Sequence, residues 1–113
     1  MRVAFDATSI GSGLGGDETM ARALLRGLLD GRGDSDEVVT LAARHVDLDD
    51  IIGDNRSRGG FGVDRIDRHD GPRHFGWHLP RWVRALTPSP DVLVCLTHSP
   101  LLGGVPVALM VPD

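Results

Sequence analysis

Short apolar runs recur along the chain, each separated from the next by a turn or a helical stretch, and they constrain the fold more than any other feature. The four clearest runs cover residues 3–5, 37–43, 91–96 and 105–111, and each contains valine. Strands that are apolar along their whole length are typical of a parallel sheet covered on both faces. Their alternation with helical stretches predicts right-handed crossover connections. We therefore predict an α/β fold with a Rossmann-like parallel sheet, flanking helices and the strand 3–5 at its centre.

Two helices and one weaker strand are expected between these runs. Residues 17–29 place apolar side chains at helical spacing, and the carboxylates of Asp17 and Glu18 complement the positive end of the helix dipole. A second helix is expected from about Pro80, because a proline ring removes a hydrogen bond from a helix interior. Residues 62–67 are interpreted as a weak strand.

Length and charge limit the classes of protein to which the chain can belong. With 113 residues it is long enough for one domain, and its net charge of −4 includes 12 basic residues that are spread along the sequence. No basic patch indicates nucleic-acid binding. No apolar run approaches the ~20 residues of a membrane-spanning helix, and the N-terminal apolar stretch is shorter than that of a signal peptide. We expect a cytoplasmic protein without a transmembrane segment.

A glycine-rich turn lies between the first predicted strand and the first predicted helix. Residues 11–16 fit the pattern G-x-G-x-x-G, whose backbone N–H groups and following helix can hold a phosphate group. In a dinucleotide site the first glycine follows the strand almost directly and an acidic residue ends the second strand, whereas here residues 7–10 intervene and no such acidic residue is present. The turn is therefore a flexible connector, a phosphate-facing loop of another type or a nicotinamide site. Its candidate ligand-binding residues are Gly13, Gly15 and Gly16.

His98 is the histidine that we expect in a ligand site. It follows the apolar run 91–96, at the edge of the sheet where ligands of α/β proteins bind, although a Thr-His-Ser-Pro turn also allows a bond to neighbouring backbone. The other histidines lack the spacing of a metal site, and we expect them to be solvated or packed on helices: His45, His69, His74 and His78. No metal site is predicted.

Three further side chains are assigned to packing. Cys95 lies within an apolar run and is expected to be a buried thiol with a raised pKa. Trp77 and Trp82 are expected in the core or at an interface, in preference to a sugar-stacking platform.

Several of these segments occur in an order and spacing that resemble one family. They are residues 1–7, the glycine-rich turn, residues 23–28, residues 77–81 (Trp-His-Leu-Pro-Arg), residues 90–94 (Pro-Asp-Val-Leu-Val) and residues 111–113 (Val-Pro-Asp). Their succession resembles the start of a GT-B glycosyltransferase of the large retaining group, glycosyltransferase group 1 or family 4. The resemblance covers most of the chain, but only the N-terminal portion of one of that family's two Rossmann-like domains.

The resemblance implies that residues 1–113 form part of the acceptor-side domain of a retaining, nucleotide-sugar-dependent glycosyltransferase. The family's donor site lies in its C-terminal domain, so this chain is expected to hold no cofactor and to be inactive alone. Gly15 and Gly16 would lie beside the donor diphosphate. Pro112 and Asp113 would align with a His-Asp pair whose histidine faces the transferred sugar, and proline offers no hydrogen-bond donor there. Asp113 and His98 are the candidate catalytic residues.

The alternative belongs to a different class of function: a stand-alone nucleotide- or phosphate-binding α/β module without transferase activity. The third interpretation is a truncated chain that folds but has no biochemical function of its own. The isolated chain is expected to self-associate, because no helix follows the run 105–111 to cover that part of the sheet. The small-molecule partners implied by the resemblance are a nucleotide sugar and a sugar acceptor.

Overall fold

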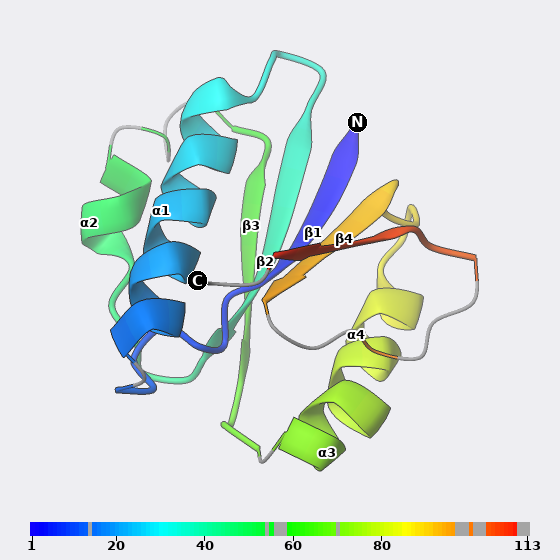
Figure 1. The fold of residues 1–113 in the computed structure, drawn as a ribbon. Coiled ribbons are helices and arrows are strands. Elements are labelled where there is room, and N and C mark those ends of the chain that lie inside the picture. The colour runs from blue at the N-terminus through cyan, green and yellow to red at the C-terminus, as the bar shows by residue number, and fades with distance from the viewer. Residues whose placement is uncertain are drawn as a thin grey trace.

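A five-stranded parallel sheet forms the centre of the protein (Figure 1). The computed structural model describes residues 1–13, 15–53, 55, 59–69, 71–96, 100 and 104–110. The strands are β1 (Arg2–Asp6), β2 (Glu37–Ala43), β3 (Phe61–Ile66), β4 (Val92–Leu96) and β5 (Val107–Met110). Their order is β3-β2-β1-β4-β5, and all neighbouring pairs run parallel. The predicted α/β fold with a parallel sheet and a central first strand is confirmed.

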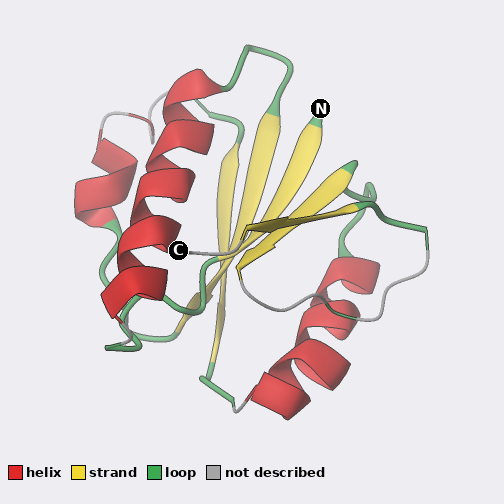
Figure 2. Cartoon of the chain, viewed as in Figure 1, coloured by secondary structure: helices red, strands yellow, loops and turns green. Residues whose placement is uncertain are grey.

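Helices cover both faces of this sheet, as Figure 2 shows. On one face lie α1 (Gly15–Gly31) and the short α2 (Asp49–Ile52). On the other face α3 (Gly71–Arg73), the π-helix η2 (His74–His78) and α4 (Leu79–Ala85) follow one another without a break. The crossovers on the two sides of β1 therefore pack against opposite faces of the sheet.

Adjacent residues of β1 reach the two halves of the core. Phe5 packs with Leu25 and Leu29 of α1, whereas Ala4 packs with Leu79 and Val83 of α4. This division follows from the strand geometry, because successive side chains point to opposite faces of a sheet. A continuous apolar run is therefore needed in a strand that is covered on both sides.

Cys95 lies in the part of the core that is beneath α4, with no exposed surface. Burial raises the pKa of its thiol to about 12, and the nearby charge of Asp6 adds to the effect. The expected buried, unreactive thiol is confirmed.

The second helical segment begins earlier than the sequence predicts. The segment starts at Gly71, whereas its α-helical part α4 begins at Leu79 with Pro80 in the first turn, as predicted. Pro72 occupies the first turn, where a missing N–H costs nothing. Directly before Pro80 the backbone widens into the π-helix, in which the N–H of Leu79 donates to the carbonyl of His74. A wider turn relieves the crowding that a proline ring creates with the preceding helical carbonyls.

The first helix also starts earlier than predicted. Gly15 and Gly16 are its first residues and not the last residues of the turn. The Thr19 hydroxyl donates to the carbonyl of Gly15 at 2.9 Å, within the first helical turn.

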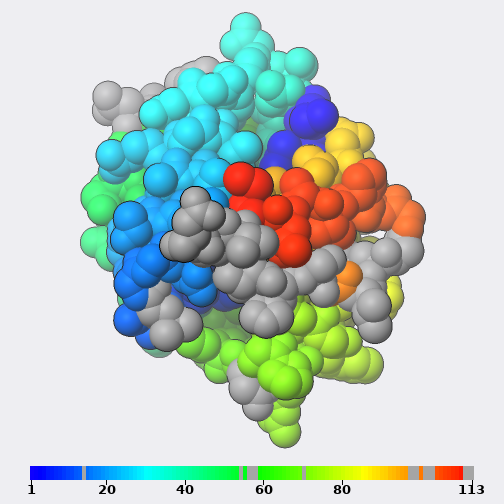
Figure 3. All heavy atoms as spheres, viewed as in Figure 1, coloured from blue at the N-terminus to red at the C-terminus, as the bar shows by residue number. Residues whose placement is uncertain are grey.

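The last described strand, β5, forms one edge of the sheet. Figure 3 shows its red atoms at the surface, and the side chain of Leu109 is 42% exposed. Across the described part of the chain, no helix is long and apolar enough to cross a membrane.

Candidate functional site

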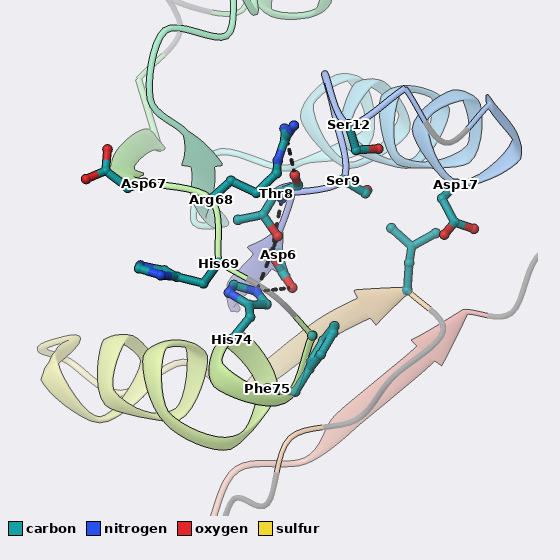
Figure 4. A pocket seen from close by; sticks show the side chains of 12 residues that line it. Asp6, Thr8, Ser9, Ser12, Asp17, Asp67, Arg68, His69, His74 and Phe75 are labelled. Carbon is teal, nitrogen blue, oxygen red and sulfur yellow. Dashed lines mark hydrogen bonds and ion pairs between the residues drawn. The ribbon is translucent and has the colours of Figure 1, made fainter.

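A cavity of about 240 Å³ lies at the carboxyl end of β1. Its walls come from the residues after β1, the start of α1, the connection after β3, the π-helix η2 and the end of β4 (Figure 4). At this point of the sheet the crossovers turn to opposite faces, and ligands of open α/β sheets bind in the crevice that results. The location of the cavity is therefore a consequence of the strand order.

Three polar side chains meet at the inner end of the cavity. The Nε2 atom of His74 lies 2.9 Å from Oδ2 of Asp6 and 3.2 Å from Oγ1 of Thr8. The Thr8 hydroxyl donates to Oδ1 of Asp6 at 2.7 Å, and the Thr8 backbone N–H donates to the same oxygen at 3.2 Å. Asp6 and His74 are each 5% exposed, so these contacts are largely shielded from water.

The hydrogen-bond pattern assigns the proton of the neutral His74 ring. The Asp6 carboxylate only accepts hydrogen bonds, so the Nε2 atom facing it must be the donor. The neutral ring then carries its lone pair on Nδ1. Every side-chain hydrogen bond of His74 to a described residue uses Nε2. Figure 4 shows the second ring nitrogen on the side turned away from Asp6.

Arg68 fastens the connection after β3 to the glycine-rich turn. Its guanidinium donates to the carbonyls of Thr8 at 3.2 Å, Ile10 at 2.9 Å and Gly11 at 3.0 Å. Through these bonds the Arg68 side chain holds the backbone of residues 8–11 in place beside the cavity. Arg68 thus joins, by hydrogen bonds, two loops that are distant in sequence.

The rest of the lining is polar on one side and apolar on the other. Asp17 and Asp67 add two carboxylates, and the hydrogen bond from Arg44 lowers the pKa of Asp67 and so favours its charged form. Phe75 and Leu96 supply the apolar wall. With its carboxylates outnumbering the one arginine, the cavity suits a neutral ligand that bears hydroxyl groups better than an anion.

Ser9 is one of the residues that line the cavity. Its Oγ is buried and has no hydrogen-bond partner among the described residues. A buried hydroxyl left in this state costs about 1–3 kcal/mol. Such groups are frequent where a ligand or ordered water completes the hydrogen bonding.

The glycine-rich turn lies beside this cavity. Gly11 and Gly13 have positive φ angles of 83° and 80°, which favour glycine. The backbone N–H of Gly11 is the main cause that lowers the pKa of Glu18, and Arg22 and the N–H of Gly13 add to it. The backbone of the turn therefore favours the charged form of a carboxylate of this chain.

The three predicted ligand-binding glycines all border open space. A Cβ added at Gly13, Gly15 or Gly16 would meet no described atom within 4 Å. Open space of this kind is what close approach of a ligand to the backbone requires. The predicted catalytic residues His98 and Asp113, together with Pro112, lie outside the described residues.

The remaining histidines were expected to be solvated or packed on helices. His74 lies in the π-helix and is buried, with its ring against the carboxylate of Asp6. Sequence reasoning did not foresee that His74 meets Asp6 at the end of the central strand, because 68 residues separate the two. The rings of His69 and His78 stack at 3.7 Å between centroids.

Among the tryptophans, Trp82 donates to Asp64 at 2.7 Å and packs against the core, as expected. Trp77 is 62% exposed and lies outside the core.

The described residues include no group of three or more histidine, cysteine or acidic side chains that could hold a metal ion. Comparisons of the chain with protein-family models, with curated proteins and with solved structures gave no match. The arguments for function therefore rest on the cavity, the turn and the sequence motifs.

Proposed function

We propose that this chain is the acceptor-side domain of a nucleotide-sugar-dependent glycosyltransferase, and that the cavity at the end of β1 receives the acceptor. The observation that carries the proposal is the position of this cavity, in the crevice where the crossovers of the sheet diverge. The motifs that resemble family 4 glycosyltransferases supply the reaction class.

The lining of the cavity supports a sugar-like acceptor. Hydroxyl groups of a sugar donate to carboxylates and to an unprotonated imidazole nitrogen, and both acceptors are present in Asp17, Asp67 and His74. The C–H face of a sugar ring packs on apolar side chains such as Phe75 and Leu96. At about 240 Å³ the cavity is smaller than the ~300–1,000 Å³ typical for drug-sized ligands. It therefore suits a monosaccharide unit better than a whole nucleotide sugar.

The donor would approach from the side of α1. Gly15 and Gly16 begin this helix in open space, next to its positive end. In this proposal the donor diphosphate lies beside them, while a second domain binds the nucleotide. His98 and Asp113 stay candidate catalytic residues, and a cytoplasmic location stays a prediction.

The second candidate function is a stand-alone phosphate-binding module. Its supporting observation is the effect of the Gly11 and Gly13 N–H groups on Glu18, because the same groups suit a phosphate oxygen. A phosphate would have to displace the Glu18 carboxylate. Glu18→Gln should then strengthen phosphate binding.

The two functions are separated by titrating the isotope-labelled chain in NMR experiments. The probes are methyl glycosides of glucose, mannose and galactose, the corresponding UDP and GDP sugars, and inorganic pyrophosphate. The glycosyltransferase proposal expects glycosides to shift signals of Thr8 and His74, and nucleotide sugars to shift those of Gly15 and Gly16. Transfer activity is assayed on the complete product of the reading frame. Pyrophosphate binding that Glu18→Gln strengthens, without any response to glycosides, would favour the module instead.

A further inference from the structure

We propose that Nδ1 of His74 is the acceptor for a hydroxyl group of the ligand in this cavity, with Asp6 and Thr8 as positioning residues. The identity of that ligand as a glycosyl acceptor rests on the proposed function. Recognition of a hydroxyl group by His74 does not.

The orientation of the His74 ring is fixed. Asp6 ends the central strand, and its carboxylate is held by two hydrogen bonds from Thr8 before it meets His74. The ring cannot turn over without placing a C–H group against this buried carboxylate. The pair therefore determines both the rotamer of His74 and the nitrogen that carries its proton.

The second ring nitrogen, Nδ1, is available to a ligand. Both hydrogen bonds of the His74 ring with described residues are made by Nε2, so Nδ1 keeps its lone pair for another partner. A carboxylate behind an imidazole also balances the positive charge that the ring gains when it takes a proton. The arrangement is that of a base held in place by an acid residue.

The groups around Nδ1 limit the class of ligand that the cavity can bind. A partner for Nδ1 must donate a hydrogen bond, which a hydroxyl group does and a phosphate dianion does not. The carboxylate of Asp17 disfavours an anion in the same space, and the N–H groups of the Arg68 guanidinium are engaged by backbone carbonyls. The fitting ligand is neutral and carries several hydroxyl groups.

In the proposed transfer reaction, the O–H bond of the acceptor breaks and an N–H bond forms at Nδ1. The electron pair of the O–H bond stays on the oxygen, which bonds the anomeric carbon of a nucleotide-sugar donor. The nucleoside diphosphate leaves with the electron pair of its C–O bond. His74 becomes an imidazolium that is paired with Asp6.

The first test needs no substitution. Nitrogen-15 NMR of the imidazole side chains reads directly which ring nitrogen is protonated. We expect a protonated Nε2 and a bare Nδ1 in His74, and a displacement of the Nδ1 signal when methyl glycosides or glycerol are added. A proton on Nδ1 in the neutral ring, or a signal that no glycoside or polyol moves, overturns the proposal.

The second test uses His74→Gln, whose amide N–H can still donate to Asp6 while no acceptor remains at the position of Nδ1. Glycoside binding should weaken about fivefold, the equivalent of one neutral hydrogen bond. His45→Gln is the matched control, because His45 is exposed and does not line the cavity. Equal loss in both variants, or no loss in His74→Gln, contradicts the proposal. If His74→Gln does not fold, the tautomer and titration of the natural chain still decide.

Asp6→Asn tests the positioning role. A carboxylate only accepts hydrogen bonds, whereas an amide can also donate one, so the amide of this variant no longer requires a proton on Nε2 of His74. The distribution of the proton between the two ring nitrogens should therefore shift in the nitrogen-15 spectrum. A purely structural role of Asp6 would change stability and leave this distribution as it was. Glycoside binding through His74 without any sugar transfer by the complete gene product would refute the proposed function and leave this inference standing.

Discussion

Nε2 of His74 lies 2.9 Å from Oδ2 of Asp6, although 68 residues separate the two in sequence. The contact joins the end of the central strand to a π-helix on one face of the sheet. Since both residues are buried, their hydrogen bonds to each other and to Thr8 replace those that water would make. The same contact anchors the helical segment that forms one wall of the cavity.

We expect a double-mutant cycle on Asp6→Ala and His74→Ala to show strong coupling. A hydrogen bond to a charged group contributes about 1.5–3 kcal/mol, and residues in direct contact do not act additively. The coupling should have this magnitude in urea unfolding followed by circular dichroism. Additive effects of the two substitutions would show that the pair contributes nothing beyond its separate packing.

The glycine-rich turn should tolerate side chains at one end only. In Gly11→Ala the new Cβ would lie 2.9 Å from Cγ2 of Val46, at a φ of 83°, so we expect a loss of about 1–3 kcal/mol. Gly16→Ala is the control, because its Cβ meets nothing within 4 Å and the position is helical. It should leave stability unchanged or raise it by up to about 1 kcal/mol. Equal melting temperatures for the two variants would refute this account of the turn.

Acid should destabilise the protein through His78. Burial is the main cause that lowers the pKa of His78 below its ordinary 6.5, and the nearby basic side chains of His69, His74, Arg73 and Arg81 add to it. The unfolded chain therefore binds a proton more readily than the folded one as the pH falls through this ordinary value. By linkage, stability decreases on that descent and stops responding to His78 below its folded pKa.

The variant His78→Phe isolates this contribution. It keeps a flat ring against His69 and removes the titrating group. We expect its free energy of unfolding to fall less steeply between about pH 7 and about pH 5 than that of the natural chain. Parallel pH profiles for the two proteins would assign the acid sensitivity to other groups.

Self-association of the isolated chain is expected to involve the edge strand β5. Leu109 is exposed at this edge, and a lysine there would place a charge on the contact. Leu109→Lys should raise the concentration at which the chain associates by at least about tenfold, the equivalent of one apolar side chain. Light scattering after size-exclusion chromatography measures this change. Ser89→Lys, on an exposed loop, adds the same charge and should have no effect.

The local pattern of the sequence predicted most of the sheet. The runs that became β2 and β4 are apolar and rich in valine, and such segments find no stable place outside a covered sheet. The bounds of the helices were less well predicted at Gly15 and Gly71, because the first turn of a helix is stabilised by neighbouring structure as much as by its own residues.

The sequence by itself predicted the α/β fold, the central place of β1 and the burial of Cys95. These features follow from the spacing of apolar residues, which can be read from the sequence without knowledge of the fold. Tertiary structure alone decided that His74 meets Asp6 and that Arg68 fastens the glycine-rich turn. These contacts join segments far apart in the chain, and they exist only once the order of the strands has brought both crossovers to the same end of the sheet. A histidine of unremarkable spacing thus becomes a buried partner through the fold, since hydrogen bonding of a side chain is set by what lies beside it in space.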